Sequence, residues 1–340
     1  MASQIDVLLY GLGAIGSFYA FILRRSNRVR LTVVARSNYA AVKENVSFPN
    51  GSRTTNHQLT TKQGILLKSA NHGEHRFYPD RVVRSPSELT HPVDYVVCTN
   101  KAIDPAGAVH SLAPAIGNDT TIVIIQNGVG NEEPFREAYP SCTIISCVTW
   151  VGASQPTPGT VIHTTSEDTE LGLYPNPNVP AAVEAERLNT FTGLLAAGQT
   201  RHTVHDNIQP TRWSKVIWNC AWNTLTTLTA LDTQAFLQSS PDAIPFTRRL
   251  MSEAVAVARA AGVPLPDDLI DSQLARIQSL GAVRTSMQID RENNRPMEIE
   301  VIVGTPVRKG RELGVPTPVL ETLYVLLRAV DGEMRRVQKI

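Results

Sequence analysis

Residues 5–25 of the sequence read IDVLLYGLGAIGSFYAFILRR, an apolar run that meets a glycine-rich turn and continues with helical spacing. Ile5 to Tyr10 is short enough to be a buried strand, and Ser17 to Arg25 repeats its apolar side chains at the period of a helix. The turn between them, GLGAIG at residues 11–16, has the GxGxxG pattern of a dinucleotide-binding loop. The stretch therefore predicts the first strand and helix of an α/β nucleotide-binding domain. An ordinary glycine-rich turn is the alternative.

The glycines of this turn have separate steric roles in a dinucleotide site. Gly11 permits the tight turn, Gly13 lets the backbone approach the pyrophosphate, and Gly16 lets the helix pack on the strand. The N-terminus of the helix faces the phosphates, because its N–H groups and its dipole favour an anion. We therefore expect five residues to contact the cofactor: Gly11, Gly13, Ala14, Ile15 and Gly16.

The second strand, Arg30 to Ala35, ends where an enzyme that uses NAD presents a carboxylate to the ribose hydroxyls. This chain continues instead with Arg36, Ser37 and Asn38. A guanidinium offers planar donors and a fixed positive charge, which suit a 2′-phosphate. The sequence therefore favours NADPH/NADP+ as the cofactor, with Arg36 as a ligand of its 2′-phosphate. A solvated loop arginine is the alternative.

Two later strands also end in polar residues, and doubly wound sheets bind their ligands at the carboxyl ends of the strands. Asp94 to Thr99 is followed by Asn100 and Lys101, and we expect Lys101 to touch the adenosine phosphate of the cofactor, with a surface lysine as the alternative. The strand at 120–125 is followed by Asn127 in QNGVG. Asn127 is a candidate to reach the nicotinamide or the substrate, although Asn-Gly after an apolar run is often only a turn.

The pattern of elements changes along the chain. Up to about residue 205, short strands at 65–69 and 75–78 predict a hairpin or an extended excursion from the sheet. We also predict strands at 142–150 and 200–205, an antiparallel pair at 159–165 and 170–174 that closes the sheet, and a helix at 180–197. Beyond this point only helical segments follow, at 210–230, 244–261, 266–279, 297–312 and 317–337. The sequence thus predicts two domains, an α/β nucleotide-binding domain at 1–205 and an all-α domain at 206–340.

Composition narrows the class of partner and the compartment. The 340 residues include 32 Lys and Arg against 31 Asp and Glu without a block of like charge, so neither nucleic acid nor an anionic membrane is expected. The four cysteines have no CxxC or His-rich spacing and are interpreted as reduced core residues, with no metal site. Without a signal-peptide pattern or a long apolar run, a cytoplasmic protein with a small-molecule substrate is expected, as a monomer or homodimer.

A second unusual stretch, WSKVIWNCAWNTLTTLTA at residues 213–230, carries a polar stripe in an apolar and aromatic segment. Lys215, Asn219 and Asn223 are spaced four apart, so they share one face of a helix. Burying one amine and two amides without partners is costly. A substrate is one candidate partner of the stripe, and the solvated face of an amphipathic helix is the alternative.

Over essentially the whole chain, this order of parts resembles the ketopantoate reductase (PanE/ApbA) family of 2-dehydropantoate 2-reductases, and most of all its fungal members. The matching residues are GLGAIG, Asn127 in QNGVG, the Lys215, Asn219 and Asn223 helix, Ser286 and Asp290 in TSMQID, and Glu298 in RPMEIEVIVG. The resemblance implies a Rossmann-type nucleotide-binding domain and an all-α domain like the C-terminal domain of 6-phosphogluconate dehydrogenase. It also implies NADPH-dependent reduction of a 2-oxo acid held in the cleft between the domains.

The resemblance assigns Lys215 as general acid, Asn219, Asn223 and Ser286 as substrate ligands, and Glu298 as an assisting catalytic residue. The chemistry agrees, since hydride delivery to a ketone leaves negative charge on oxygen, and a cationic donor beside that oxygen stabilises the charge and supplies the proton. Glu298 has two possible partners, Lys215 or a distal hydroxyl of the substrate. Surface or capping roles are the alternatives for Glu298 and Ser286, and Asp290 has an equal claim to a structural role.

Three departures from the family pattern leave the substrate open. Val303 stands where many members have Asn, Trp150-Val151 precedes Gly152-Ala153 where relatives often have smaller or polar groups, and the loop at 48–61 is longer than in compact bacterial relatives. Reduction of ketopantoate to pantoate in pantothenate biosynthesis is the function that the resemblance implies. A paralogue that reduces another ketone or imine in secondary metabolism and a non-catalytic NADP-binding regulator are the alternatives.

Overall fold

The computed structural model describes residues 4–43 and 64–337, and these divide into two compact units. Unit 1 contains the described residues of 1–100, 106–126 and 132–208. Unit 2 contains Lys101–Pro105, Asn127–Asn131 and the described residues from Gln209 onward. Two short segments from the first part of the chain therefore pack with the helical unit, which the predicted division at 205 and 206 did not include. The long loop expected at 48–61 lies outside the described residues.

Unit 1 is built on a sheet to which the described residues contribute eight strands, in the order β12-β11-β8-β7-β6-β1-β2-β5. The pairs along it are parallel except β8 with β11, which are antiparallel. Its strands are β1 Ile5–Tyr10, β2 Val29–Val34, β5 Arg81–Val83, β6 Tyr95–Cys98, β7 Thr121–Ile125, β8 Thr143–Thr149, β11 Thr169–Tyr174 and β12 His202–Val204. A mainly parallel sheet of this kind must bury both faces, and its strands are accordingly apolar.

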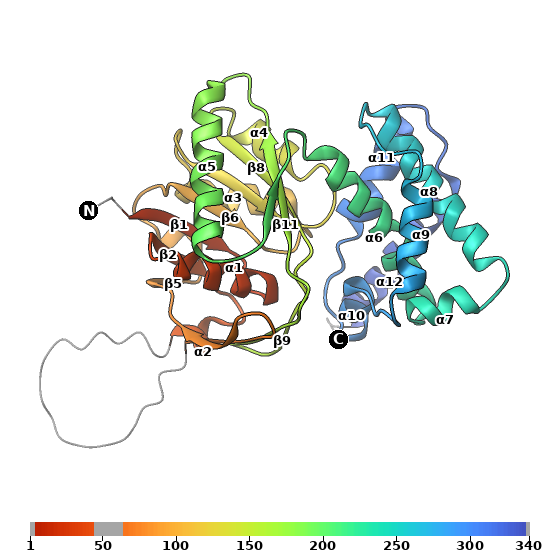
Figure 1. Ribbon diagram of the computed structural model, residues 1–340, viewed down its shortest axis with the longest axis horizontal. Helices are drawn as coiled ribbons and strands as arrows, with labels where there is room; N and C mark the ends of the chain where they lie inside the picture. Colours follow the sequence, from red (N-terminus) through yellow and green to blue (C-terminus); the bar gives the residue numbers. More distant parts are fainter. Residues whose placement is uncertain (1–3, 44–63, 338–340) are drawn as a thin grey trace, which may run out of the picture. The chain divides into compact units, whose positions relative to one another are not determined.

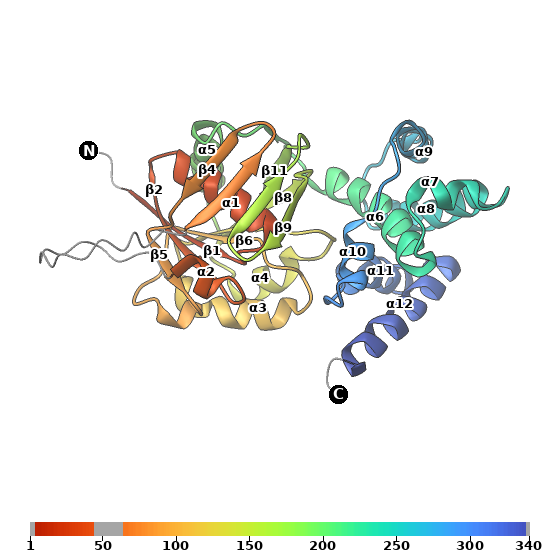
Figure 2. The same ribbon diagram turned by 90° about the horizontal axis from the view of Figure 1, so that it is seen from below.

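Helices cover both faces of this sheet. On one face, α1 (Ala14–Arg25) and α5 (Ala181–Ala197) bury Phe18 and Phe191 against Val7 and Leu9 (Figure 1). Along β1 the alternate side chains point the other way, to the face covered by α3 (Pro105–Leu112) and α4 (Glu132–Ala138) (Figure 2). Short helical turns complete the connections: α2 Tyr39–Lys43, η1 Pro86–Glu88 and η2 Ala113–Ala115. The predicted Rossmann-type architecture is confirmed.

A second sheet in unit 1 corrects one sequence prediction. Its order is β4-β3-β10-β9, with β3 Ile65–Ser69, β4 Gly73–Phe77, β9 Ala153–Thr157 and β10 Thr160–His163. The hairpin of β3 and β4 is confirmed. The predicted antiparallel pair at 159–165 and 170–174 is wrong, because β10 pairs with β3 and β9 whereas β11 pairs with β8 and β12. The chain passes to the second sheet between β8 and β9 and back between β10 and β11. These two connections meet where Gly152 N donates to Ser166 O.

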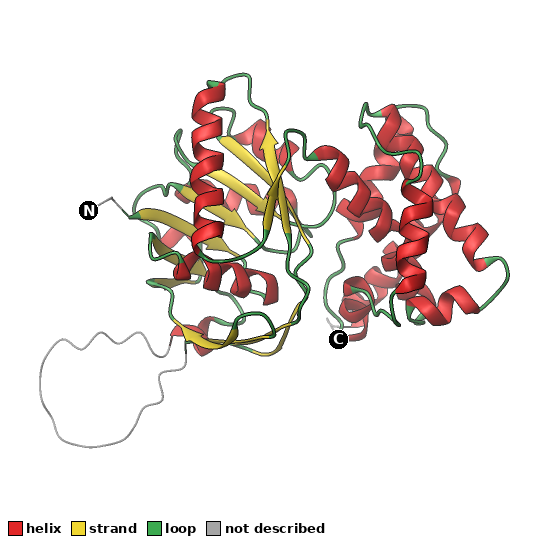
Figure 3. Cartoon of the chain, in the orientation of Figure 1, coloured by secondary structure: helices red, strands yellow, loops and turns green. Residues whose placement is uncertain are grey.

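Unit 2 consists of helices and loops throughout its described residues (Figure 3). Its helices are α6 Gln209–Thr229, α7 Thr233–Gln238, α8 Ala243–Ala260, α9 Leu269–Ser279, α10 Ser286–Glu292, the π-helical turn η3 Glu300–Gly304, α11 Thr305–Glu312 and α12 Pro318–Val337. The predicted all-α domain is confirmed. The helix predicted at 297–312 begins instead with the π-helical turn.

The central element of unit 2 is α6, which packs on α7, α8, α10 and α12. Its side chains Trp213, Ile217, Trp222 and Leu225 are buried in the core, which explains why the segment is so apolar. The sequence did not predict α7 and α10, which are only six and seven residues long. Helices of this length show too few turns for a periodic pattern, and each is marked mainly by its N-cap residue.

Candidate active site

The glycine turn between β1 and α1 has the geometry expected of a dinucleotide loop. Gly11 has a φ of +109°, and a Cβ atom there would lie 2.4 Å from Asn100 N. A Cβ atom at Gly16 would lie 1.9 Å from Gly11 O, so only glycine allows this packing of helix on strand. A Cβ atom at Gly13 would meet nothing within 4 Å. The turn is therefore closely packed at Gly11 and Gly16 and open at Gly13.

The N-terminus of α1 fits an anion such as a pyrophosphate. Gly13 is its N-cap residue and makes no side-chain capping hydrogen bond, and the first turn carries no acidic residue. The N–H groups of a first helical turn lack intrahelical partners and attract negative charge. The residues present at this turn thus fit the phosphates of the expected cofactor.

Arg36 follows β2 directly after Ala35, at the carboxyl edge of the sheet. Its guanidinium donates to Tyr10 Oη at 2.6 Å and lies 5.6 Å from the centre of the Tyr10 ring. Arg36 and Ser37 are exposed, whereas Asn38 is buried and donates to Gln155 Oε1 at 3.1 Å. An exposed guanidinium and hydroxyl are donors that a 2′-phosphate requires.

The polar stripe on α6 is largely buried. Asn219 is 8% exposed and Asn223 is 3% exposed, and Lys215 at the start of the stripe is half-buried. The amide Nδ2 of Asn223 is shielded from solvent and has no hydrogen-bond partner. The alternative prediction, that the stripe is a solvated helix face, is therefore wrong for the two asparagines. An unpartnered buried donor is costly to keep, which fits a group that awaits a ligand.

Two predicted site residues that lie 171 positions apart in the sequence are in contact. Asn127 donates from Nδ2 to Glu298 Oε2 at 2.9 Å. The other carboxylate oxygen, Oε1, accepts from Ala102 N at 3.0 Å. Glu298 is thus a buried carboxylate held by two N–H donors, one from each short segment that packs with the helical unit.

The loop that carries Asn127 is fixed by a residue that the sequence did not single out. Arg212 on α6 is buried and donates to Gly128 O at 2.8 Å. Val129 N donates to Val301 O at 3.1 Å, and a Cβ atom on Gly128 would lie 2.4 Å from Val301 Cβ. The available signal was an arginine inside the apolar helix, three positions before Lys215.

Lys101 and Asp290 form an ion pair of 2.5 Å, and Asp290 also accepts from Arg295 Nε at 3.0 Å. These contacts fit the structural role that was one of the two expected for Asp290. The contact of Lys101 with the adenosine phosphate stays a prediction. Ser286 is an exposed residue at the start of α10. The N-cap residue of α10 is Thr285, which accepts from Gln288 N at 3.4 Å, so Ser286 does not have the capping role that was its alternative.

Comparison with known proteins identifies the family. The family model described as ketopantoate reductase PanE/ApbA matches residues 50–176, and the model of its C terminal matches residues 207–331. The 2-dehydropantoate 2-reductase of Methylococcus capsulatus has a crystal structure with a TM-score of 0.82 and 34% identity, covering 97% of this chain and 98% of that one. The chain belongs to the ketopantoate reductase family. It is an oxidoreductase, and the family uses NADPH.

Curated members of the family extend the match. The 2-dehydropantoate 2-reductase of Nostoc sp. is 30% identical over 231 residues, which are 67% of this chain and 70% of that protein. The enzyme of the same name from Mesorhizobium japonicum is 26% identical over 349 residues, which cover 97% of this chain and 98% of that protein. The resemblance inferred from the motifs is thus confirmed for the family and for its oxidoreductase class.

Val303, where many ketopantoate reductases have Asn, is fully buried in the hydrophobic core of unit 2. It lies in the π-helical turn, whose Ile302 O accepts from Cys220 Sγ on α6 at 3.0 Å. Such turns are frequent at functional sites. The side chain of Val303 nevertheless packs as a core residue of this family member.

A cavity of about 290 Å³ in unit 2 lies beside the neighbours of Glu298 in sequence. None of the predicted site residues lines this cavity. The residues that line it are Ala102, Ile103, Met297, Ile299, Glu300, Arg328, Asp331, Gly332 and Arg335. Its charged groups are paired with each other, as in Arg328 with Glu300 and Arg335 with Asp331. We therefore keep the candidate site on the α6 stripe and the Asn127–Glu298 contact.

The described part of the chain contains no helix long and apolar enough to cross a membrane. Over residues 4–43 and 64–337 there is also no group of three or more His, Cys, Asp or Glu side chains that fits a metal ion. The four cysteines are buried, as expected of core residues. In particular, burial raises the pKa of the Cys220 thiol on α6, which does not favour a thiolate.

Proposed function

We propose that the chain reduces a 2-oxo acid to a 2-hydroxy acid with NADPH, and that the substrate is 2-dehydropantoate (ketopantoate), which becomes (R)-pantoate in pantothenate biosynthesis. The observation that carries this proposal is the stripe on α6, where the amine of Lys215 is followed by two buried amides and the Nδ2 atom of Asn223 has no partner. The names of the relatives supply the substrate.

The cofactor assignment rests on unit 1. The open backbone at Gly13, the uncapped N-terminus of α1 and the exposed guanidinium of Arg36 fit a pyrophosphate and a 2′-phosphate. When bound, NADPH supplies the hydride that reduces the ketone carbon. Gly11, Gly13, Ala14, Ile15 and Gly16 bind the pyrophosphate side of the cofactor in this proposal.

Lys215 acts on the oxygen of the ketone. The oxygen gains negative charge as the carbonyl carbon is reduced, and an ammonium group beside it stabilises that charge and transfers a proton to it. The product is then a neutral hydroxyl, and the amine is left to be protonated again by water. Lys215 is half-buried, and a donor is most effective where bulk water is limited.

The neighbouring polar groups orient the substrate. Asn219 and Asn223 donate to its carboxylate or hydroxyl oxygens without a change of charge, and the exposed hydroxyl of Ser286 adds a further donor. Glu298 accepts from the Nδ2 atom of Asn127, and this contact does not use Oδ1 of Asn127. Glu298 acts in this proposal by fixing Asn127 and by binding a distal hydroxyl of the substrate.

The test is the oxidation of NADPH, followed by its absorbance, with ketopantoate and a panel of other 2-oxo acids. We expect kcat/KM to be highest for ketopantoate. A strong preference for another oxo acid would instead support a paralogue that reduces a different substrate. NADPH binding without turnover of any member of the panel would contradict the proposed reaction.

The assembly and the compartment are not needed for this chemistry. The expected monomer or homodimer and the expected cytoplasmic location stay predictions. Light scattering coupled to size exclusion distinguishes the two assemblies directly.

A further inference from the structure

The end of β5 brings a second arginine to the edge of the sheet where Arg36 lies. β5 pairs with β2 in parallel, with Val83 opposite Val34, and Ala35 N donates to Val83 O at 2.9 Å. Arg36 and Arg84 are the next residues of these two strands. Since neighbouring strands lie about 4.8 Å apart, the backbones of the two arginines emerge side by side.

The ring of Tyr39 holds the side chain of Arg84. The Cζ atom of Arg84 lies 4.2 Å from the centre of this ring, and Lys43 Nζ lies 4.7 Å from it and donates to Tyr39 Oη. Tyr39 N donates to Arg36 O at 3.2 Å, so the ring belongs to the same turn as Arg36. Two cationic side chains, Arg84 and Lys43, therefore lie against the Tyr39 ring, while the guanidinium of Arg36 lies against the Tyr10 ring. A guanidinium that stacks on a ring keeps its N–H edge available for an anion.

The charge of this group is not balanced by ion pairs. Among residues 4–43 and 64–337, no carboxylate pairs with Arg36, Lys43 or Arg84. The nearby Glu88 carboxylate accepts from the backbone N of Arg84 at 2.6 Å and from Ser85 N at 3.2 Å, as part of a capping box.

Arginines elsewhere on unit 1 behave differently. Arg24 pairs with Asp80 at 2.9 Å, and Arg30 pairs with Asp6. Two exposed guanidiniums without such a partner, on adjacent strand ends, form a cationic surface that suits a dianion.

We propose that Arg84 is a second ligand of the 2′-phosphate of NADPH, paired with Arg36 and held in place by the ring of Tyr39. This inference rests on the NADPH assignment of the proposed function. A phosphate monoester carries about −1.5 to −2 charges at neutral pH, more than one guanidinium neutralises. Lys101, the other cation expected near the adenosine phosphate, is paired with Asp290 in unit 2. Arg84 thus contributes to the choice of NADPH over NADH.

The test measures binding rather than turnover. Dissociation constants of NADPH, NADH, 2′,5′-ADP and 5′-AMP are determined by titration calorimetry for the wild type, Arg84→Ala, Arg84→Lys and Tyr39→Leu. We expect Arg84→Ala to weaken NADPH and 2′,5′-ADP about 10- to 100-fold and NADH and 5′-AMP less than about 3-fold, which is the range for lost hydrogen bonds to a charged group. Arg84→Lys and Tyr39→Leu should fall between Arg84→Ala and the wild type.

The matched control is Arg81→Ala, which removes an exposed arginine from the same strand. Arg81 donates to Glu88 O, so it has a local partner of its own. Equal losses in Arg81→Ala and Arg84→Ala would show a general charge effect and overturn the inference, as would Arg84→Ala with wild-type affinity for NADPH. Equal affinity of the wild type for NADPH and NADH would overturn the NADPH assignment itself. If the wild type prefers NADPH, that assignment stands, and the affinities of Arg84→Ala then test the role of Arg84 alone.

Discussion

Asn223 and Asn176 show how one residue type serves two purposes in this chain. Each is 3% exposed. Asn176 donates from Nδ2 to Pro140 O and Cys142 O, both at 2.9 Å, whereas Nδ2 of Asn223 has no partner. Removing a satisfied amide leaves its acceptors unpaired, but removing an unsatisfied one relieves a desolvated polar group.

At the residue scale we therefore expect opposite effects from the same near-isosteric change. Asn223→Leu should leave the free energy of unfolding unchanged or raise it by about 1 kcal/mol, and should lower kcat/KM for the oxo acid at least about 10-fold. Asn176→Leu should lower the free energy of unfolding by about 1–3 kcal/mol without a change in kcat/KM. Urea unfolding and steady-state kinetics of both variants measure this. If Asn223→Leu lowered the free energy of unfolding and left kcat/KM unchanged, Asn223 would be a structural residue and the prediction would be contradicted.

The residue scale also shows where sequence reasoning succeeded. The need for glycine at positions 11 and 16 followed from a motif whose steric demands are local, and the structure has that geometry. The contact of Gly13 with a pyrophosphate stays a prediction. Arg212 and Arg84 could not be assigned in this way. Their partners, Gly128 O and the Tyr39 ring, are distant in sequence. The apolar segment around Arg212 indicates that this arginine is buried but not which group it binds, and no local pattern distinguishes Arg84 from a solvated arginine.

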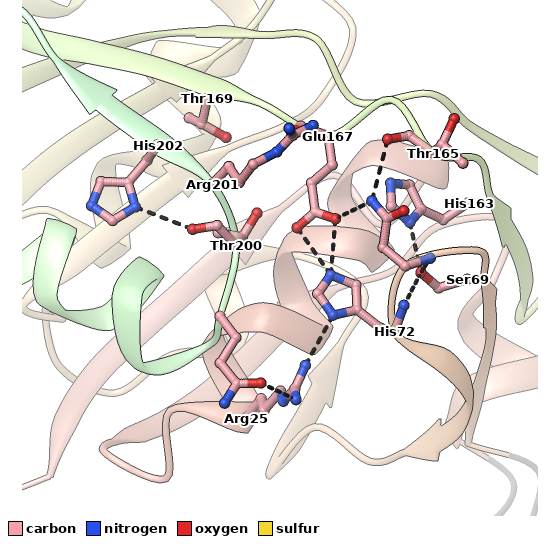
Figure 4. A network of polar contacts seen from close by, with 12 residues as sticks. Arg25, Ser69, His72, His163, Thr165, Glu167, Thr169, Thr200, Arg201 and His202 are labelled. Atoms are coloured by element: carbon pink, nitrogen blue, oxygen red, sulfur yellow. Dashed lines mark hydrogen bonds and ion pairs between the residues drawn. The ribbon is translucent and has the colours of Figure 1, made fainter.

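At the scale of elements, a polar network ties the β3–β4 hairpin to the connection between β10 and β11 (Figure 4). Arg25 can only donate, so Nδ1 of His72 accepts from it at 2.9 Å and Nε2 of His72 donates to Glu167 at 2.9 Å. Ser166 O can only accept, so Nε2 of His163 donates to it at 3.2 Å, and in the neutral ring Nδ1 then accepts from Ser69 Oγ at 2.8 Å. Burial favours the neutral form of the His163 imidazole.

This network makes stability depend on pH. Burial lowers the pKa of His163 from its ordinary value of 6.5, so the unfolded chain binds a proton more readily than the folded one. Stability should be full above about pH 6.5 and should fall as the pH drops below this value towards the lower folded pKa. Urea unfolding between about pH 8 and pH 5 measures this slope. His163→Gln should flatten it, whereas His110→Gln, at an exposed position on α3, should not.

Glu167 adds a second loss at lower pH. Burial alone would raise the pKa of its carboxyl group, but hydrogen bonds from Asn71 and His72 outweigh burial and lower it below 4.5. Its ionised form therefore stabilises the fold above that value, and the stabilisation disappears as the pH falls through the folded pKa. If the free energy of unfolding of His163→Gln changed with pH above about pH 5 as steeply as that of the wild type, this account of the network would be contradicted.

The sheets illustrate what element patterns determine and what they leave open. The strands at 159–165 and 170–174 were located correctly to within a few residues, but their pairing was not. Alternation of apolar residues indicates that a strand has a buried face, and it says nothing about which neighbour that strand meets. The switch between sheets at Gly152 and Ser166 depends on backbone hydrogen bonds formed only in the folded chain.

For the whole molecule, the order of an α/β unit and a helical unit followed from the change in periodicity near residue 206. The packing of Lys101–Pro105 and Asn127–Asn131 with the helical unit did not, because both segments follow strands of unit 1 in the sequence. They place Asn127 beside Glu298, and this contact joins two residues that the motifs had selected separately. The family pattern found these residues, and the structure shows their contact.

The central claim is that unit 1 holds NADPH and Lys215 on unit 2 protonates the substrate, so the decisive measurement is kcat of Lys215→Ala alongside its affinity for NADPH. We expect kcat with ketopantoate to fall about 10²- to 10⁴-fold, with little change in the dissociation constant of NADPH. Lys68→Ala, which removes an exposed lysine paired with Glu74 in unit 1, should keep wild-type kcat. A Lys215→Ala enzyme that reduces ketopantoate at the wild-type rate would contradict the account.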